Sequence, residues 1–86
     1  MRENEHFRET LADIRTTFGE GVKMLTVQQV GEYLACDRRT VAALIRKNKL
    51  VGVDINPIGK NSTYRVPVEA LARFITKKEK QNEKMY

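Results

Sequence analysis

The stretch that decides the fold is LTVQQVGEYLACDRRTVAALIRKNKL, residues 25–50. Thr26 is placed to cap a helix, and Gln29 follows three residues later to complete a capping box. Apolar residues then recur at helical spacing: Val27, Val30, Tyr33 and Leu34. This spacing predicts a short amphipathic helix over residues 27–34 whose apolar face is turned toward the core.

A second helix is predicted over about residues 38–47. Asp37 is placed to cap it, because its carboxylate accepts hydrogen bonds from the free backbone N–H groups of the first turn. Between the two helices stand the small residues Ala35 and Cys36, and we expect Cys36 to be a small buried thiol. Helices joined by so short a turn must cross steeply, as in a helix-turn-helix.

Two different faces are predicted for the second helix, because each residue advances about 100° around its axis. One face carries apolar residues: Val41, Leu44 and Ile45. The opposite face carries Arg39, Ala42, Ala43, Arg46 and Lys47, with Arg38 at the border. A helix in the major groove needs small residues at closest approach and cationic side chains beside them. We therefore interpret the acid-free face as a DNA-reading surface; the alternative is an ordinary solvated face.

A hairpin is predicted directly after this helix. Asn48 suits a left-handed helix terminus, with Lys49 just beyond it. Two β-rich segments, LVGVDI at 50–55 and TYRV at 63–66, then flank a loop rich in Asn, Pro and Gly. Its candidates for contact with a phosphate or the minor groove are Lys60, Asn61 and Arg65. The alternative for the tip is a solvated turn.

An amphipathic helix is predicted ahead of this region, from about Asn4 to Phe18. Its apolar stripe consists of Phe7, Leu11, Ile14 and Phe18. Gly19 and Gly21 end the helix, because glycine accepts the left-handed conformation that closes one. We interpret the stripe as packing on the domain behind it. The alternative is a protein-contact helix for dimerisation or for a larger partner.

The last predicted helix begins at Pro67, which suits a first helical turn. Its core stripe consists of Val68, Leu71, Phe74 and Ile75. Beyond Thr76 the sequence KKEKQNEKMY is charged, and we expect it to fray. The predicted organisation is an N-terminal helix and connector at 1–22, a DNA-binding domain at 23–76 and a charged tail at 77–86.

The composition of the chain limits the kinds of function that it can have. The 86 residues carry a net charge of +5, with net −1 in residues 1–24, +4 in 25–66 and +2 in 67–86, so a polyanionic partner would meet the middle and the tail first. One cysteine and one histidine cannot form a zinc site or an intramolecular disulfide, and no nucleophile-base pair is recognisable. We expect no enzyme activity and no cofactor. No apolar run is long enough to span a bilayer, so we expect a cytoplasmic protein that makes no membrane contact.

The pattern carries a family resemblance. LTVQQVGEYLACDRRTVAALIRKNKL, followed by the hairpin and YRVPVEALARFI, resembles the excisionase-like and MerR-like winged helix-turn-helix DNA-binding domains over about residues 24–75. Its most specific elements are the Leu-Thr opening, RRTV at 38–41 and the Arg-Val-Pro segment before the last helix. The resemblance implies a mainly α fold with a small β-hairpin, here with an extra N-terminal amphipathic helix.

This chain departs from the usual family residues at five positions. The family usually has Ala at position 31, Gly at 35, Ser at 37, an aromatic residue at 42 and Gly at 48, where this chain has Gly31, Ala35, Asp37, Ala42 and Asn48. Most of these departures keep the backbone role of the position. The aromatic residue often touches phosphate, so Ala42 leads us to expect more of the affinity in the wing and the tail.

Family resemblance implies double-stranded DNA as the partner, with the second helix in the major groove and the wing beside it. Small members are often excisionases, which bend DNA, bind it cooperatively as several copies, and make an integrase excise rather than integrate. That is our main hypothesis. The second hypothesis is a small transcriptional regulator with the same chemistry. The third is a protein-binding adaptor that uses the N-terminal helix.

Overall fold

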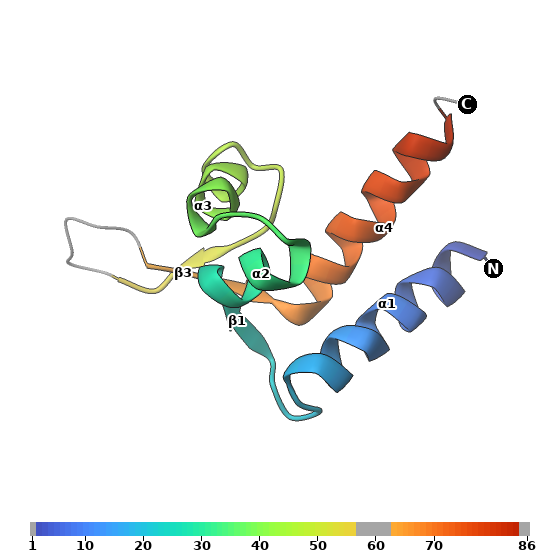
Figure 1. The fold of residues 1–86 in the computed structure, drawn as a ribbon, viewed down its shortest axis with the longest axis horizontal. Helices are drawn as coiled ribbons and strands as arrows, with labels where there is room; N and C mark the ends of the chain where they lie inside the picture. The colour runs from blue at the N-terminus through green and yellow to red at the C-terminus, as the bar shows by residue number, and fades with distance from the viewer. Residues whose placement is uncertain (1, 57–62, 85–86) are drawn as a thin grey trace.

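The computed structural model describes residues 2–56 and 63–84, and the side chains of 5–56 and 63–77 (Figure 1). The described residues form α1 (Arg2–Phe18), β1 (Met24–Thr26), α2 (Val27–Leu34), α3 (Arg38–Arg46), β2 (Val53–Asp54), β3 (Tyr64–Pro67) and α4 (Val68–Lys84). This mostly helical chain with a small antiparallel sheet confirms the predicted winged helix-turn-helix.

The sheet has the strand order β1-β3-β2, and both pairs are antiparallel. The sequence does not predict β1, whose last residue, Thr26, is assigned from the sequence only as a helix cap. Three residues are too few to show a periodic pattern. The strand exists because Leu25 pairs with Val66 on β3, and both side chains are fully buried.

The two short helices begin where the sequence predicts. The Thr26 hydroxyl accepts from the Gln29 backbone N–H at 3.0 Å, and the Gln29 side chain accepts from the Thr26 N–H at 3.0 Å, which confirms the capping box. Asp37 caps α3 by accepting from the Arg39 N–H at 2.9 Å. Cys36 is half-buried rather than buried, because it lies in the turn at the end of α2 and not under a helix.

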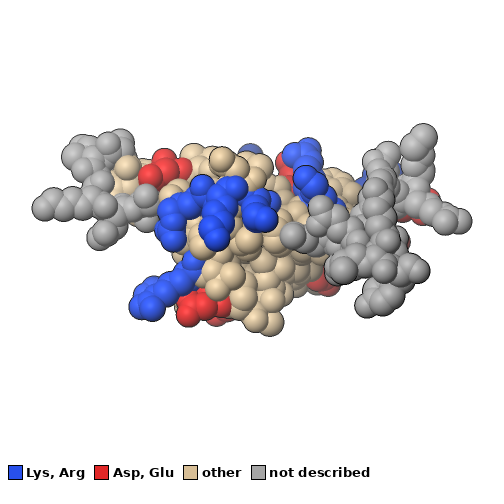
Figure 2. Space-filling view, turned by 90° about the horizontal axis from the view of Figure 1, so that it is seen from above, with Lys and Arg blue, Asp and Glu red and all other residues tan. Residues whose placement is uncertain are grey.

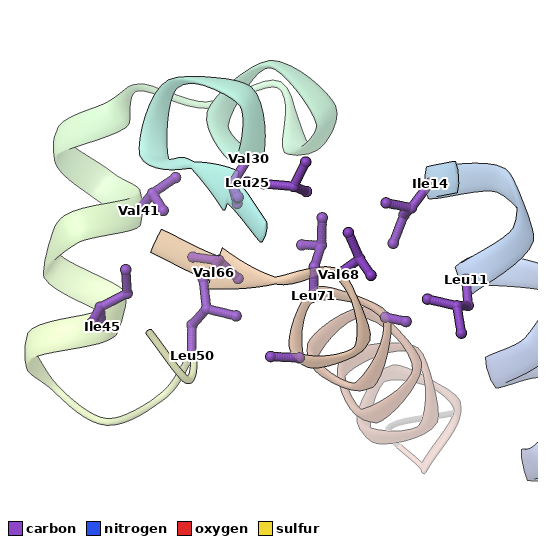
Figure 3. Packing of buried hydrophobic residues seen from close by; sticks show 12 residues of the cluster. Leu11, Ile14, Leu25, Val30, Val41, Ile45, Leu50, Val66, Val68 and Leu71 are labelled. Carbon is purple, nitrogen blue, oxygen red and sulfur yellow. The ribbon is translucent and has the colours of Figure 1, made fainter. Parts of the chain in front are cut away.

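A single apolar core joins every helix to the sheet (Figure 3). Val41 and Ile45 of α3 face Val66 and Leu50, while α4 contributes Leu71. The N-terminal helix takes part in this core: α1 lies along α4 in Figure 1, and its apolar stripe is covered. Leu11 and Ile14 are buried, and Phe7 and Phe18 are half-buried against the cluster. The prediction that the stripe packs on the domain is confirmed.

Polar and aromatic contacts also hold α1 in place. The Tyr33 hydroxyl on α2 donates to the Asp13 carboxylate on α1, and the Tyr33 ring lies 6.0 Å from that of Phe18 between centroids. Burial raises the pKa of Tyr33, and the hydrogen bond and charge of Asp13 raise it further, to about 12. The guanidinium carbon of Arg73 lies 5.8 Å from the centroid of the Phe7 ring, in cation-π range.

Several element boundaries differ from the predicted ones, most clearly in the hairpin and the last helix. Pro67 is the last residue of β3, and α4 begins one residue later. β2 is limited to Val53–Asp54, where only the pairing with β3 defines a strand. The prediction that the chain frays beyond Thr76 is wrong, because α4 continues to Lys84. Its last turns need no apolar stripe of their own to remain helical, since Lys, Glu and Gln have high helix propensity.

Candidate nucleic-acid interface

α3 is fixed to the core by one face and turns the other to solvent. Val41 is 0% exposed and Ile45 7%, which sets the rotation of the helix about its axis. The polar residues predicted for DNA contact are all exposed on α3 and just beyond it: Arg38, Arg39, Thr40, Arg46, Lys47 and Lys49. Figure 2 shows basic side chains gathered side by side over the part of the molecule where α3 lies.

Small residues occupy the centre of this surface. Ala42 and Ala43 follow Arg39 by three and four residues and precede Arg46 by four and three, so both lie between the two arginines on the helix surface. Each alanine is half-buried. Two long cationic side chains therefore flank a stretch of the helix surface that carries only short side chains. This is the shape predicted for close approach to base edges.

The guanidinium groups of Arg39 and Arg46 have no partner among the described residues. In the part of the chain that the structure describes, the side chain of neither residue takes part in a hydrogen bond or an ion pair. The carboxylate nearest to Arg39 in the sequence, that of Asp37, is used to cap the helix. Both guanidinium groups thus keep their full set of N–H donors for an external acceptor.

The turn after α3 keeps Lys49 beside the helix. Asn48 has φ 61°, which confirms the predicted left-handed terminus. The N–H groups of Lys49 and Leu50 both bind the Leu44 carbonyl, at 2.9 and 3.2 Å, and the Leu50 side chain is buried. The chain then passes close to α3, because a Cβ on Gly52 would lie 2.8 Å from Cδ1 of Ile45. This turn holds the exposed Lys47 and Lys49 at the end of the basic surface.

Where the hairpin meets the sheet, a carboxylate organises the start of the loop. Asp54 accepts hydrogen bonds from the backbone N–H groups of Asn56 and Thr63, at 3.0 and 3.2 Å, and the Ile55 N–H donates to the Thr63 carbonyl at 2.8 Å. The sequence interpretation missed this role of Asp54. Its signal was an Asp two residues before an Asn at the start of a turn. Lys60 and Asn61 lie outside the described residues.

Arg65 lies apart from the α3 surface. Val66 points into the core that α3 covers, and successive residues of a strand point to opposite faces, so Arg65 belongs to the other face of the sheet. There it pairs in register with Thr26 and Val53. The side chain is half-buried, and its guanidinium donates to the Tyr64 carbonyl at 3.1 Å.

Comparison with models of protein families shows which family this chain belongs to. The sequence model of a family described as "Helix-turn-helix domain" matches residues 24–79, from the start of β1 into α4. The chain belongs to this helix-turn-helix family. Comparisons with curated proteins and with solved structures found no match. Membership confirms the family predicted from the sequence and indicates DNA binding, since helix-turn-helix domains place their second helix in the major groove.

The helix-turn-helix match begins after α1, so the family model does not account for the N-terminal helix. Packing of α1 against α4 extends the core of the domain beyond the matched residues. Within the described residues, no helix is long and apolar enough to cross a membrane.

Proposed function

We propose that this protein binds double-stranded DNA in a sequence-specific manner, with α3 as the recognition helix in the major groove. The observation that carries the proposal is the exposed, acid-free face of α3. Its basic groups have no partner among the described residues, and its rotation is fixed by Val41 and Ile45. Such a face neutralises phosphates and brings donors to base edges at the same time.

Each exposed residue has a role that follows from its place on α3. Arg39 and Arg46 flank the alanines and are assigned to base edges. Arg38 and Thr40 lie in the first turn and are assigned to the DNA backbone, where helix N-termini commonly bind phosphates. Lys47 and Lys49 extend the phosphate track from the other end of the helix. Additional contacts are proposed for the wing: Lys60, Asn61 and, from the face of the sheet opposite to the α3 surface, Arg65.

The finer proposal is an excisionase-type role, in which several copies bind cooperatively and direct an integrase toward excision. The resemblance of residues 24–75 to excisionase-like domains supports it. The partners are then double-stranded DNA, further copies of this chain on the DNA, and an integrase. An integrase gene beside the gene of this protein favours excision, whereas a divergent promoter without one favours transcriptional regulation.

Footprinting of the full chain on DNA that flanks its own gene tests both sequence-specific binding and the excisionase-type role. We expect protection of a discrete site that Arg39→Ala and Arg46→Ala weaken. Arg8→Ala is the matched control, because it removes the same exposed charge from α1. Protection of tandem, phased repeats supports cooperative architectural binding. A single palindrome contradicts the excisionase role and indicates a dimeric regulator. The absence of a footprint on any such DNA contradicts sequence-specific binding.

Recombination itself tests the excisionase role. With the integrase of the same element and a plasmid that carries both attachment sites, the wild-type protein should raise the excision product. Arg39→Ala should lower this stimulation in proportion to its loss of affinity, and Arg8→Ala should retain it. Full excision in the absence of the protein would contradict the role.

A further inference from the structure

We propose that α3 recognises a site in which two guanines lie about three base-pair steps apart, with thymine methyl groups in the steps between them. This inference rests on the proposed function and specifies the DNA sequence that the same surface selects. It is carried by the chemistry and spacing of four residues on α3: Arg39, Ala42, Ala43 and Arg46.

The reading face is rich in hydrogen-bond donors and poor in acceptors. Its arginines present only N–H donors, and its alanines only methyl groups. No Asp, Glu, Asn or Gln occurs in residues 38–47. In the major groove, an amide side chain pairs bidentately with adenine and a carboxylate accepts from cytosine, whereas the arginine fork matches the two acceptors O6 and N7 of guanine. Guanine is therefore the base that Arg39 and Arg46 suit.

Helix geometry gives the spacing between the two arginines. Arg46 follows Arg39 by seven positions, so the two side chains leave the axis within about 20° of one another, at about 100° per residue. They are offset by about 10.5 Å along the axis, at a rise of roughly 1.5 Å per residue. With the axis of α3 taken as parallel to the DNA axis, where base pairs rise about 3.4 Å per step, the offset corresponds to about three steps.

Between the arginines, the alanines select by apolar contact. Ala42 and Ala43 are the lowest points of the face, half-buried between longer side chains. Methyl groups of alanine pack on the C5-methyl of thymine, the apolar group that thymine presents in the major groove. A helix with alanines at this position approaches the bases closely enough for both arginines to reach them.

In vitro selection from random duplexes with the full chain, followed by equilibrium titration, tests the inference. Selected sites should contain the two guanines at the stated spacing. Replacing either guanine by 7-deazaguanine removes the N7 acceptor but keeps O6, so it breaks one of the two hydrogen bonds. It should weaken wild-type binding measurably, and by less than the about 5- to 150-fold that corresponds to the 1–3 kcal/mol of a full bidentate pair. Replacing the intervening thymines by uracil removes only the methyl groups and should weaken binding to a smaller extent.

Matched variants identify which arginine reads which guanine. Arg39→Ala should lose sensitivity to 7-deazaguanine at one position and keep it at the other, and Arg46→Ala should show the reverse pattern. Lys47→Ala should weaken binding to all duplexes and keep both sensitivities. Circular dichroism of each variant should match that of the wild type, because the substituted side chains are exposed.

The outcomes separate this inference from the proposed function. Selected sites without paired guanines, or 7-deazaguanine effects that persist unchanged in both arginine variants, would overturn the inference while leaving sequence-specific binding in place. Binding of every duplex with equal affinity would overturn the inference and the proposed function together.

Discussion

Gly31 and Cys36 meet so closely across the helix-turn-helix turn that a Cβ on Gly31 would lie 2.7 Å from the Cys36 carbonyl oxygen. The Cys36 N–H in turn donates to the Gly31 carbonyl at 2.8 Å. Ala35, the residue that makes the turn, has φ 60° and ψ 44°, the left-handed conformation that favours glycine. The family that the chain resembles usually has alanine at position 31 and glycine at position 35, and this chain has Gly31 and Ala35 instead.

Gly31→Ala should destabilise the fold by about 1–3 kcal/mol, the usual cost of overpacking, even though alanine is the better helix former. The contact is with backbone, which cannot move aside as the end of a side chain can. Urea denaturation measures the effect. Gly21→Ala is the control, because nothing lies within 4 Å of a Cβ there, and its change should stay within about 0.5 kcal/mol. Equal effects at both positions would contradict the close approach.

Ala35→Gly should stabilise the fold by about 0.5–1 kcal/mol. The left-handed conformation costs a residue with a Cβ about 1–2 kcal/mol, which exceeds the extra conformational entropy that glycine loses on folding. The same change within a helix, Ala12→Gly on the exposed side of α1, should destabilise by about 1 kcal/mol. Thermal denaturation of both variants shows whether the two signs are opposite, as the backbone angles require.

Ile14→Ala tests whether α1 belongs to the folded core. Ile14 is fully buried, so its truncation should cost about 2–5 kcal/mol, a large share of the stability of so small a domain. Glu9→Ala is the control on the same helix, because Glu9 is exposed. If unfolding of the Ile14 variant matched the wild type, α1 would not be packed on the domain.

Tyr33→Phe removes the hydroxyl that joins α2 to Asp13 on α1, and should cost about 0.5–1.5 kcal/mol at neutral pH. The pKa of Tyr33 is raised to about 12 in the folded protein, above its ordinary value of 10.0. The folded state therefore holds this proton more tightly, and the stabilisation is fully present below pH 10 and is lost as pH rises toward 12.

Chemical denaturation of wild type and Tyr33→Phe from pH 8 to 12 measures this dependence as a difference between the two proteins. The gap in unfolding free energy between the two proteins should narrow above pH 10. A gap that is independent of pH for Tyr33→Phe would contradict the link to Asp13.

Much of the fold was predictable from local signals. The capping residues Thr26 and Asp37 act through bonds to residues two or three positions away, so sequence alone reveals them. β1 was not predictable, because Leu25 becomes a strand residue only through its distant partner Val66. The length of α4 was missed because a charged segment without an apolar stripe gives no periodic signal.

Part of the candidate site was likewise predictable from local sequence, and part depends on contacts between distant residues. The outward rotation of Arg39 and Arg46 follows from the inward Val41 and Ile45 on the same helix, and the structure agrees. Arg65 was grouped with them from its place in the hairpin. Its position on the other face of the sheet depends on the strand register, which the sequence does not specify.

The most direct test of the recognition helix is the affinity of the full chain for its selected DNA site, measured by fluorescence anisotropy at several salt concentrations. Arg39→Ala and Arg46→Ala should each weaken specific binding by about 1–3 kcal/mol, and Arg8→Ala on α1 should leave it within about 0.5 kcal/mol of wild type. Unchanged affinity in both α3 variants would contradict the assignment of α3 as the DNA-reading helix.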